Sequence, residues 1–111
     1  MDRTDSYMNI VRQLLESYAQ APPSCGQIEM ETVFDDTRRH YQLMALGWQG
    51  KRRVHGCVIH IDIRGDRVWV QHDSTDANIA GTMAEMGIPP EHIVPGFLPE
   101  SMRRHSGFAV N

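Results

Sequence analysis

Residues 60–73, with the sequence HIDIRGDRVWVQHD, constrain the fold more than any other stretch of the chain. Apolar and polar side chains alternate on both sides of Gly65-Asp66, which has the composition of a two-residue hairpin turn. Pairing across this turn places Ile61 opposite Val70 on one apolar face. Such a face needs a second layer to cover it, so this stretch predicts a sheet packed against a helix.

The other elements follow from similar patterns. Apolar residues at helical spacing predict a first helix over residues 7–18, which Ala21-Pro22-Pro23 would end. Thr75 is the expected N-cap of a second helix that ends at Met86, and a short helical segment is expected near residues 99–104. Period-two alternation between turns predicts four strands, at residues 28–34, 40–48, 53–63 and 67–72.

These elements predict one α+β domain over residues 1–111. Its N-terminal helix would pack on a four-stranded antiparallel meander, followed by the second helix and the short helical C-terminal segment. Cys25 and Cys57 lie far apart without a CxxC spacing, which argues against a disulfide framework and a cysteine zinc site. The absence of a signal-peptide pattern and of a long apolar run predicts a cytoplasmic protein without a membrane span.

The second face of the predicted sheet is polar, with an apolar band formed by Tyr41, Leu43, Val58 and Trp69. The expected register places His60 opposite Gln71 in the hairpin, and pairing across Gly50-Lys51 adds Tyr41 beside His60 and Leu43 beside Val58. The residues of this candidate partner-facing or structural face are Tyr41, Leu43, Val58, His60, Asp62, Trp69, Gln71 and Asp73. Either the second helix or tail of the chain, or a partner or symmetry mate in a homodimer, would cover the band, with Trp69 as its anchor.

The polar side chains of this face have a structural explanation. Arg39 is expected beside Asp62 as an ion-pair partner, and His60 as a hydrogen-bonded structural histidine. His72 is predicted on the opposite face, which leaves too few ligands for a metal, and no cofactor is expected. No nucleophile or GxSxG, Walker or HExxH motif accompanies the face, so no catalytic residue is assigned. A small enzyme that uses His60 with Asp62 or Asp73 stays as the alternative.

The charge of the chain argues against strong DNA binding by the protein alone. The formal net charge is -3, and the basic residues form three separated clusters, Arg38-Arg39, Lys51-Arg52-Arg53 and Arg103-Arg104. Such short clusters predict non-specific affinity of about 10⁻⁴ M or weaker at physiological salt. A direct DNA-binding factor is therefore a further alternative rather than the leading hypothesis.

The order and spacing of short motifs resemble the XisI family of fdxN element excision controlling factors over nearly the whole chain. The motifs are Gln13-Leu14-Leu15, Tyr18-Ala19, Phe34-Asp35, His40-Tyr41-Gln42-Leu43, Gly47-Trp48, Lys51-Arg52-Arg53-Val54, Gly56-Cys57-Val58, His60-Ile61-Asp62-Ile63, Val68-Trp69-Val70-Gln71, His72-Asp73, Thr75, Ile79-Ala80, Gly87-Ile88-Pro89, Ile93-Val94, Gly96-Phe97 and Phe108-Ala109-Val110. Asp76, Pro95 and Ser106-Gly107 depart from the family pattern, in loops and the tail.

This resemblance implies an accessory role in programmed DNA rearrangement. It implies action alongside the companion protein XisH, which is similar to restriction-endonuclease-like nucleases, and more indirectly alongside a site-specific recombinase. The family offers no catalytic residues to carry over. We therefore expect a non-enzymatic controlling factor that acts through contacts with a XisH-like partner.

Overall fold

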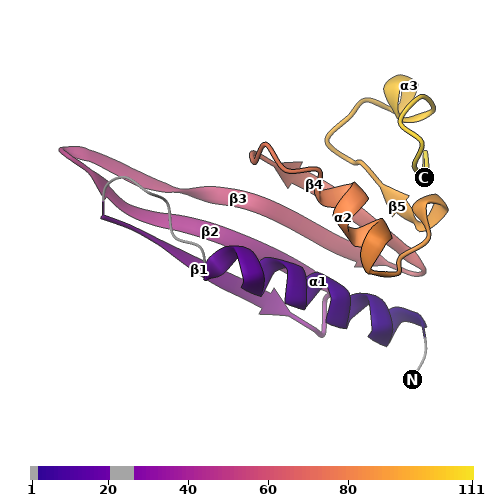
Figure 1. The fold of residues 1–111 in the computed structure, drawn as a ribbon, viewed down its shortest axis with the longest axis horizontal. Helices are drawn as coiled ribbons and strands as arrows, with labels where there is room; N and C mark the ends of the chain where they lie inside the picture. Colours follow the sequence, from indigo (N-terminus) through magenta and orange to yellow (C-terminus); the bar gives the residue numbers. More distant parts are fainter. Residues whose placement is uncertain (1–2, 21–26) are drawn as a thin grey trace.

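The computed structural model describes residues 3–20 and 27–111 (Figure 1). Its elements are α1 (Arg3–Ala19), β1 (Gln27–Asp35), β2 (His40–Gln49), β3 (Arg52–Arg64), β4 (Arg67–Asp73), α2 (Ile79–Met86), the 3-10 helix η1 (Pro90–His92), β5 (Ile93–Val94) and α3 (Glu100–Arg103). The first helix, the four predicted strands and the short C-terminal helix are thus present. The expected stop of α1 at Ala21-Pro22-Pro23 lies outside the described residues.

The sheet is mixed and has five strands, in the order β1-β2-β3-β4-β5. The first four strands form the predicted antiparallel meander. β5 adds a parallel strand, with Val68 beside Ile93 and Trp69 beside Val94. The prediction of four strands missed β5, because β5 has only two residues, too few to show any periodicity. Its place depends on the crossover through α2, which returns the chain to the edge of β4.

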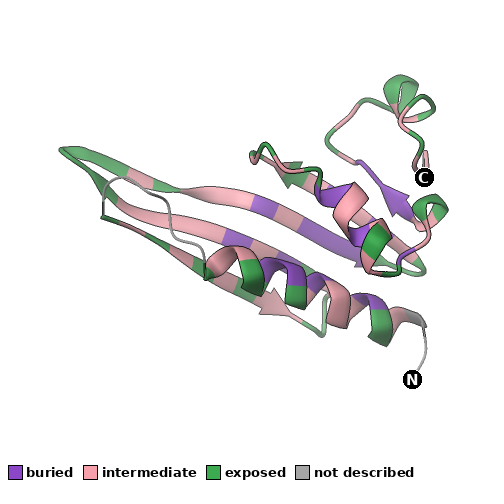
Figure 2. Cartoon of the chain, in the orientation of Figure 1, coloured by how far each residue is buried: buried purple, intermediate pink, exposed green. Residues whose placement is uncertain are grey.

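The core lies between the sheet and two helices on one of its faces (Figures 1 and 2). The stripe of α1 packs Val11 and Leu15, both fully buried, against the apolar face formed by β1, β2 and β3. Met83 of α2 joins the same cluster. Burial of each such side chain contributes about 1.5–3 kcal/mol, so tertiary packing accounts for most of the stability of these short helices. No helix within residues 3–20 and 27–111 is long and apolar enough to cross a membrane.

The start of α2 differs from the prediction. The helix begins at Ile79, and the side chain of Asn78 caps it by accepting a hydrogen bond from the Gly81 backbone at 3.0 Å. Thr75, the expected cap, instead donates its hydroxyl to Asp73 Oδ1 at 2.6 Å in a local turn. Asparagine and threonine are both good caps, and the sequence alone did not separate them. The end at Met86 is confirmed.

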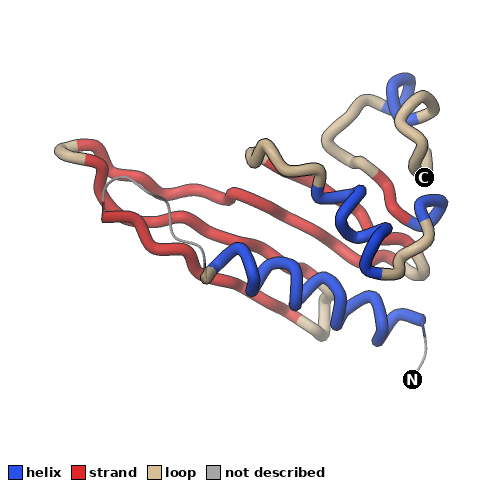
Figure 3. Tube along the Cα trace, viewed as in Figure 1, coloured by secondary structure: helices blue, strands red, loops and turns tan. Residues whose placement is uncertain are grey.

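The β2–β3 hairpin projects beyond the helices (Figure 3). β4 pairs with β3 only from Ile59 onward. Within the described part of the chain, the segment Arg52–Cys57 is therefore paired on one side alone, by β2. Figure 2 shows this end of the hairpin as half-buried and exposed. The hydrophobic core does not extend to this end of the hairpin.

Candidate functional site

Two β-bulges decide which side chains share the outer face of the sheet, opposite α1. In the hairpin of residues 60–73, the expected pairs closest to the turn are confirmed, including Ile61 with Val70. The register then shifts, and His60 pairs with His72 instead of Gln71. The expected opposition of His60 and Gln71 is therefore wrong, because Gln71 is an extra residue in its strand.

The second bulge lies between β2 and β3. Leu43 pairs with Ile59 and Met44 with Cys57, which leaves Val58 without an opposite residue. As a result, the expected register is wrong by one position here: it placed Leu43 opposite Val58 and Tyr41 opposite His60. Because the side-chain period of a strand is two, a shift of one residue moves a side chain to the other face.

Tyr41 and Leu43 consequently belong to the core and not to the outer face. Both are fully buried, and Tyr41 pairs with Ile61 on the helix side. The Tyr41 hydroxyl donates to Asp36 Oδ1 at 2.9 Å, and Arg12 of α1 contacts the same oxygen at 2.7 Å. Burial, together with the hydrogen bond to Asp36, raises the pKa of Tyr41. Tyr41 therefore links β2 to α1, and the proposed apolar band loses two of its members.

The outer face instead holds a compact cluster around Asp62. This carboxylate is only 4% exposed, and its Oδ1 accepts hydrogen bonds from His40 Nδ1 at 2.7 Å and from His60 Nε2 at 2.8 Å. Gln71 Nε2 donates to Oδ2 at 3.2 Å. Burial alone would raise the pKa of Asp62, but the hydrogen bonds from the two histidines and Gln71 outweigh it and lower the pKa below 3.8. The cluster thus holds a buried carboxylate in its charged form.

The sequence pattern predicted Arg39 beside Asp62 and gave no role to His40, but the structure places His40 there. His40 pairs directly with Asp62, whereas Arg39 lies in the turn before β2, where its carbonyl oxygen accepts a hydrogen bond from Ile63 at 3.0 Å. The alternation within β2 could have revealed it. If Tyr41 points to the core, His40 must point to the other face.

Trp69 lies on the outer face, but the C-terminal segment of the chain packs against it. A Cβ added at Gly96 would come within 3.0 Å of the indole ring, so this backbone runs directly against it. The guanidinium groups of Arg64 and Arg103 lie 5.2 and 5.3 Å from the ring centroid. Arg103 also donates to the Val110 carbonyl at 3.1 Å. The tail of the chain, which was one of the two expected covers, thus packs against the Trp69 part of the band.

Asp73 does not join the cluster. The bulge pairs it with Ile59, and its carboxylate accepts hydrogen bonds from the backbone and hydroxyl of Thr75 at 2.8 and 2.6 Å. Of the eight residues of the predicted face, the structure brings together His60, Asp62 and Gln71, with Trp69 beside them.

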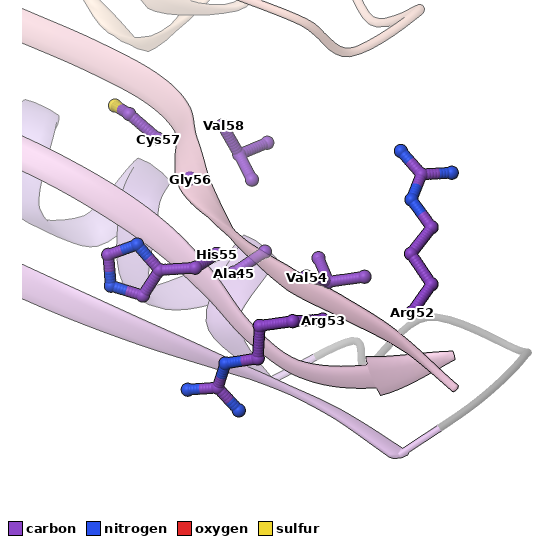
Figure 4. Close-up of a pocket in the computed structure, with 8 residues that line it drawn as sticks. All are labelled: Ala45, Arg52, Arg53, Val54, His55, Gly56, Cys57 and Val58. Carbon is purple, nitrogen blue, oxygen red and sulfur yellow. The ribbon is translucent and has the colours of Figure 1, made fainter. Parts of the chain in front are cut away.

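A shallow groove of about 290 Å³ lies at the projecting end of the β2–β3 hairpin (Figure 4). Its lining residues are Ala45, Arg52, Arg53, Val54, His55, Gly56, Cys57 and Val58. Arg52 and Arg53 extend from opposite sides of the strand. Burial raises the pKa of the Cys57 thiol, which lowers its reactivity as a nucleophile. The two arginines make the groove a cationic surface feature.

The charge of Asp62 gives a testable pH dependence of stability. Its pKa is lower in the folded protein, so the ionised carboxylate stabilises the fold above the unfolded-state value of 3.8, and this contribution is lost as the pH falls through the folded-state pKa. We expect the free energy of unfolding to fall less steeply between about pH 4 and pH 2 in Asp62→Asn than in the wild type. Urea denaturation at each pH measures this. Asp76→Asn, at an exposed position, should keep the wild-type slope.

Comparisons with known proteins cover the whole chain. The family model for the XisI protein matches residues 1–110. A crystal structure of a XisI-like protein from Anabaena variabilis ATCC 29413 is 37% identical, with a TM-score of 0.89 over 97% of this chain and 99% of that one. The fdxN element excision controlling factor XisI from the same organism is 26% identical, with a TM-score of 0.84 over 99% of this chain and 100% of that one. A comparison with curated proteins gives no match.

Proposed function

The chain belongs to the XisI family, and from this premise we propose that it is a controlling factor for the excision of a DNA element. In this proposal it is an accessory protein without catalytic activity of its own. It acts through contacts with a XisH-like protein of nuclease fold, and through that protein on a site-specific recombinase.

One observation carries the proposal. The structure matches the fdxN element excision controlling factor over 99% of this chain and 100% of that one. The elements that surround the core and those that project from it therefore have counterparts in a protein named for control of excision. The family name describes a role in excision, and the protein contacts are the further step that we propose.

The projecting end of the β2–β3 hairpin is the contact region that this function favours. Among residues 3–20 and 27–111, no strand pairs with the edge at Arg52–Cys57 on the side away from β2, and such edges pair readily with a partner strand. Lys51 and Arg52 are exposed there, and Trp48 is 48% exposed. A basic edge beside an exposed aromatic side chain suits a partner with an acidic surface.

Direct DNA binding is less well supported. Arg38 forms an ion pair with Asp35 at 3.5 Å, and Arg103 is engaged by Trp69 and backbone carbonyls of the tail. The hairpin tip and α3, which carry two of the basic clusters, lie at opposite ends of the molecule (Figure 1). A negatively charged chain with dispersed basic residues is expected to bind DNA weakly by itself.

Co-expression with a XisH-like protein tests the proposal. We expect the two proteins to co-purify, and an excision assay to require this chain. A double variant with Lys51→Glu and Arg52→Glu should reduce co-purification by about tenfold or more, because it reverses the charge of the proposed contact region. Arg104→Glu, at an exposed position in a different basic cluster, is the matched control and should bind normally.

Three outcomes would overturn the proposal in whole or in part. If excision proceeds equally well without this chain, the controlling role is wrong. If the purified protein binds DNA selectively at sub-micromolar concentration and no XisH-like protein associates with it, the DNA-binding alternative replaces the contact mechanism. An enzyme built on His60 and Asp62 would be favoured if His60→Ala folds and associates normally but abolishes excision.

A further inference from the structure

We propose that His40, His60 and Asp62 form a binding site for a divalent transition-metal ion, with an open coordination position toward solvent. The site is independent of the proposed contact region, which lies at the other end of β3. No metal site was expected from the sequence because His72 was predicted on the opposite face and His40 was not considered. The prediction for His72 was wrong, because the bulge pairs it with His60, and the third ligand is His40.

The geometry of the three side chains favours coordination. One ligand atom from each residue lies within 4.8 Å of the other two. The two nitrogen atoms are already 2.7 and 2.8 Å from Asp62 Oδ1. A metal with bonds of about 2.0–2.2 Å holds its ligand atoms roughly 3 Å apart, so the cluster needs only small adjustments to surround an ion.

The strands hold the ligands in place. His40 is the first residue of β2 and pairs directly with Asp62 near the end of β3, the central strand of the sheet. His60 and Asp62 are two residues apart on β3 and therefore project from the same face. Ligands fixed on paired strands keep their relative positions better than ligands on loops.

The types of ligand narrow the choice of ion. Two imidazoles and one carboxylate suit zinc, iron(II) or cobalt(II), whereas calcium and magnesium prefer sites made of oxygen atoms. Three protein ligands also leave a fourth position for water, as in catalytic zinc sites, whereas structural sites use four protein ligands. The His40 side chain is 49% exposed, so an ion can enter and the open position can face solvent on this side.

Two neighbouring side chains have opposite effects on the affinity of the site for a metal ion. Gln71 Nε2 donates to the second oxygen of Asp62 and orients the carboxylate, as outer hydrogen bonds do in metal sites. The Arg64 guanidinium lies 3.9 Å from that oxygen and disfavours a cation. Arg64 is 61% exposed and packs on the ring of Trp69, so its charge is largely screened by water.

Metal would replace the two hydrogen bonds to Asp62 Oδ1. In the metal-free arrangement His40 Nδ1 and His60 Nε2 face Asp62 Oδ1, and because a charged carboxylate can only accept, these two nitrogen atoms must carry protons. On coordination, each proton would move to the other nitrogen of its ring, as metal-bound histidines require. The same three residues thus support a metal-free and a metal-bound arrangement without a change of fold.

Titration of untagged, chelator-treated protein tests the proposal. We expect calorimetry with Zn²⁺ to give one equivalent per chain, and Co²⁺ to give a visible absorption band typical of nitrogen and oxygen ligands. His40→Ala should weaken Zn²⁺ binding at least a hundredfold, and Gln71→Ala about tenfold. His55→Ala, which removes an exposed histidine from the hairpin end, is the matched control and should bind as the wild type does.

A thermal unfolding series separates loss of binding from loss of folding. His40 is half-exposed at the start of its strand, so His40→Ala should fold. Zn²⁺ should raise the melting temperature of the wild type and of His55→Ala but not of His40→Ala, because ligand binding to the folded state stabilises it. The proposal is overturned if the wild type binds less than one equivalent, or if His40→Ala binds Zn²⁺ with unchanged affinity.

Discussion

Replacement of Gly47 by alanine is expected to lower the free energy of unfolding by about 3 kcal/mol or more. Gly47 has a φ of 149°, a backbone conformation that residues other than glycine rarely adopt. An added Cβ would overlap the backbone carbonyl oxygen of Gln27 and lie 2.8 Å from Ile28 Cα. Since Ile28 pairs with Gly47, β1 would have to separate from β2 at this point. Urea denaturation followed by circular dichroism measures the loss.

Gly56 provides the matched control on the neighbouring strand. An added Cβ at this position meets nothing within 4 Å. Gly56→Ala should therefore change the free energy of unfolding by no more than about 0.5 kcal/mol. Equal effects of the two substitutions would mean that the close approach of β1 to Gly47 does not constrain the fold.

Trp69→Ala is expected to lower the free energy of unfolding by about 3 kcal/mol and to loosen the C-terminal segment. The indole ring fills the space between the sheet, the Gly96 backbone and the guanidinium group of Arg103. Its removal leaves a cavity and takes away the cation–π contact with Arg103 that holds the tail. Relative to the wild type, the substitution should accelerate hydrogen exchange more in residues 95–111 than in α1. Unfolding by urea gives the overall loss of stability.

Trp48→Ala is the control for the loss of an indole ring. Trp48 is 48% exposed and has one cation–π contact, with Arg53 at 5.3 Å. Its removal should cost at most about 1 kcal/mol, with no change in the exchange of the tail. If Trp69→Ala leaves the tail and the stability unchanged but weakens partner binding, Trp69 is the partner anchor that the sequence suggested.

The sequence was sufficient for features that repeat over several residues. The hairpin at residues 60–73 was predicted down to the pairing of Ile61 with Val70, because alternation and the Gly65-Asp66 turn act together. The first helix and the meander followed from the same kind of signal. The resemblance to the XisI family was also visible, because many weak motifs in fixed order identify a family better than any one of them.

Short elements gave no comparable signal. β5 consists of two residues, and its pairing with β4 depends on how α2, which connects the two strands, packs on the sheet. Likewise, Asn78 and Thr75 are both suitable caps, and only the packing of Ile79 in the core selects the later start of α2.

The composition of the candidate site was decided by tertiary structure. The sequence identified His60 and Asp62 on one face, since residues two apart in a strand must share it. Whether Tyr41 or His40 lies beside them depends on a single extra residue at the bulge between β2 and β3. Turn composition fixes the register near the turn, but burial of Tyr41 and Leu43 under α1 fixes it at the far end. The registers at the two ends of the β2–β3 pairing differ by one residue, and Val58 is the extra residue at the bulge. His40 therefore pairs with Asp62.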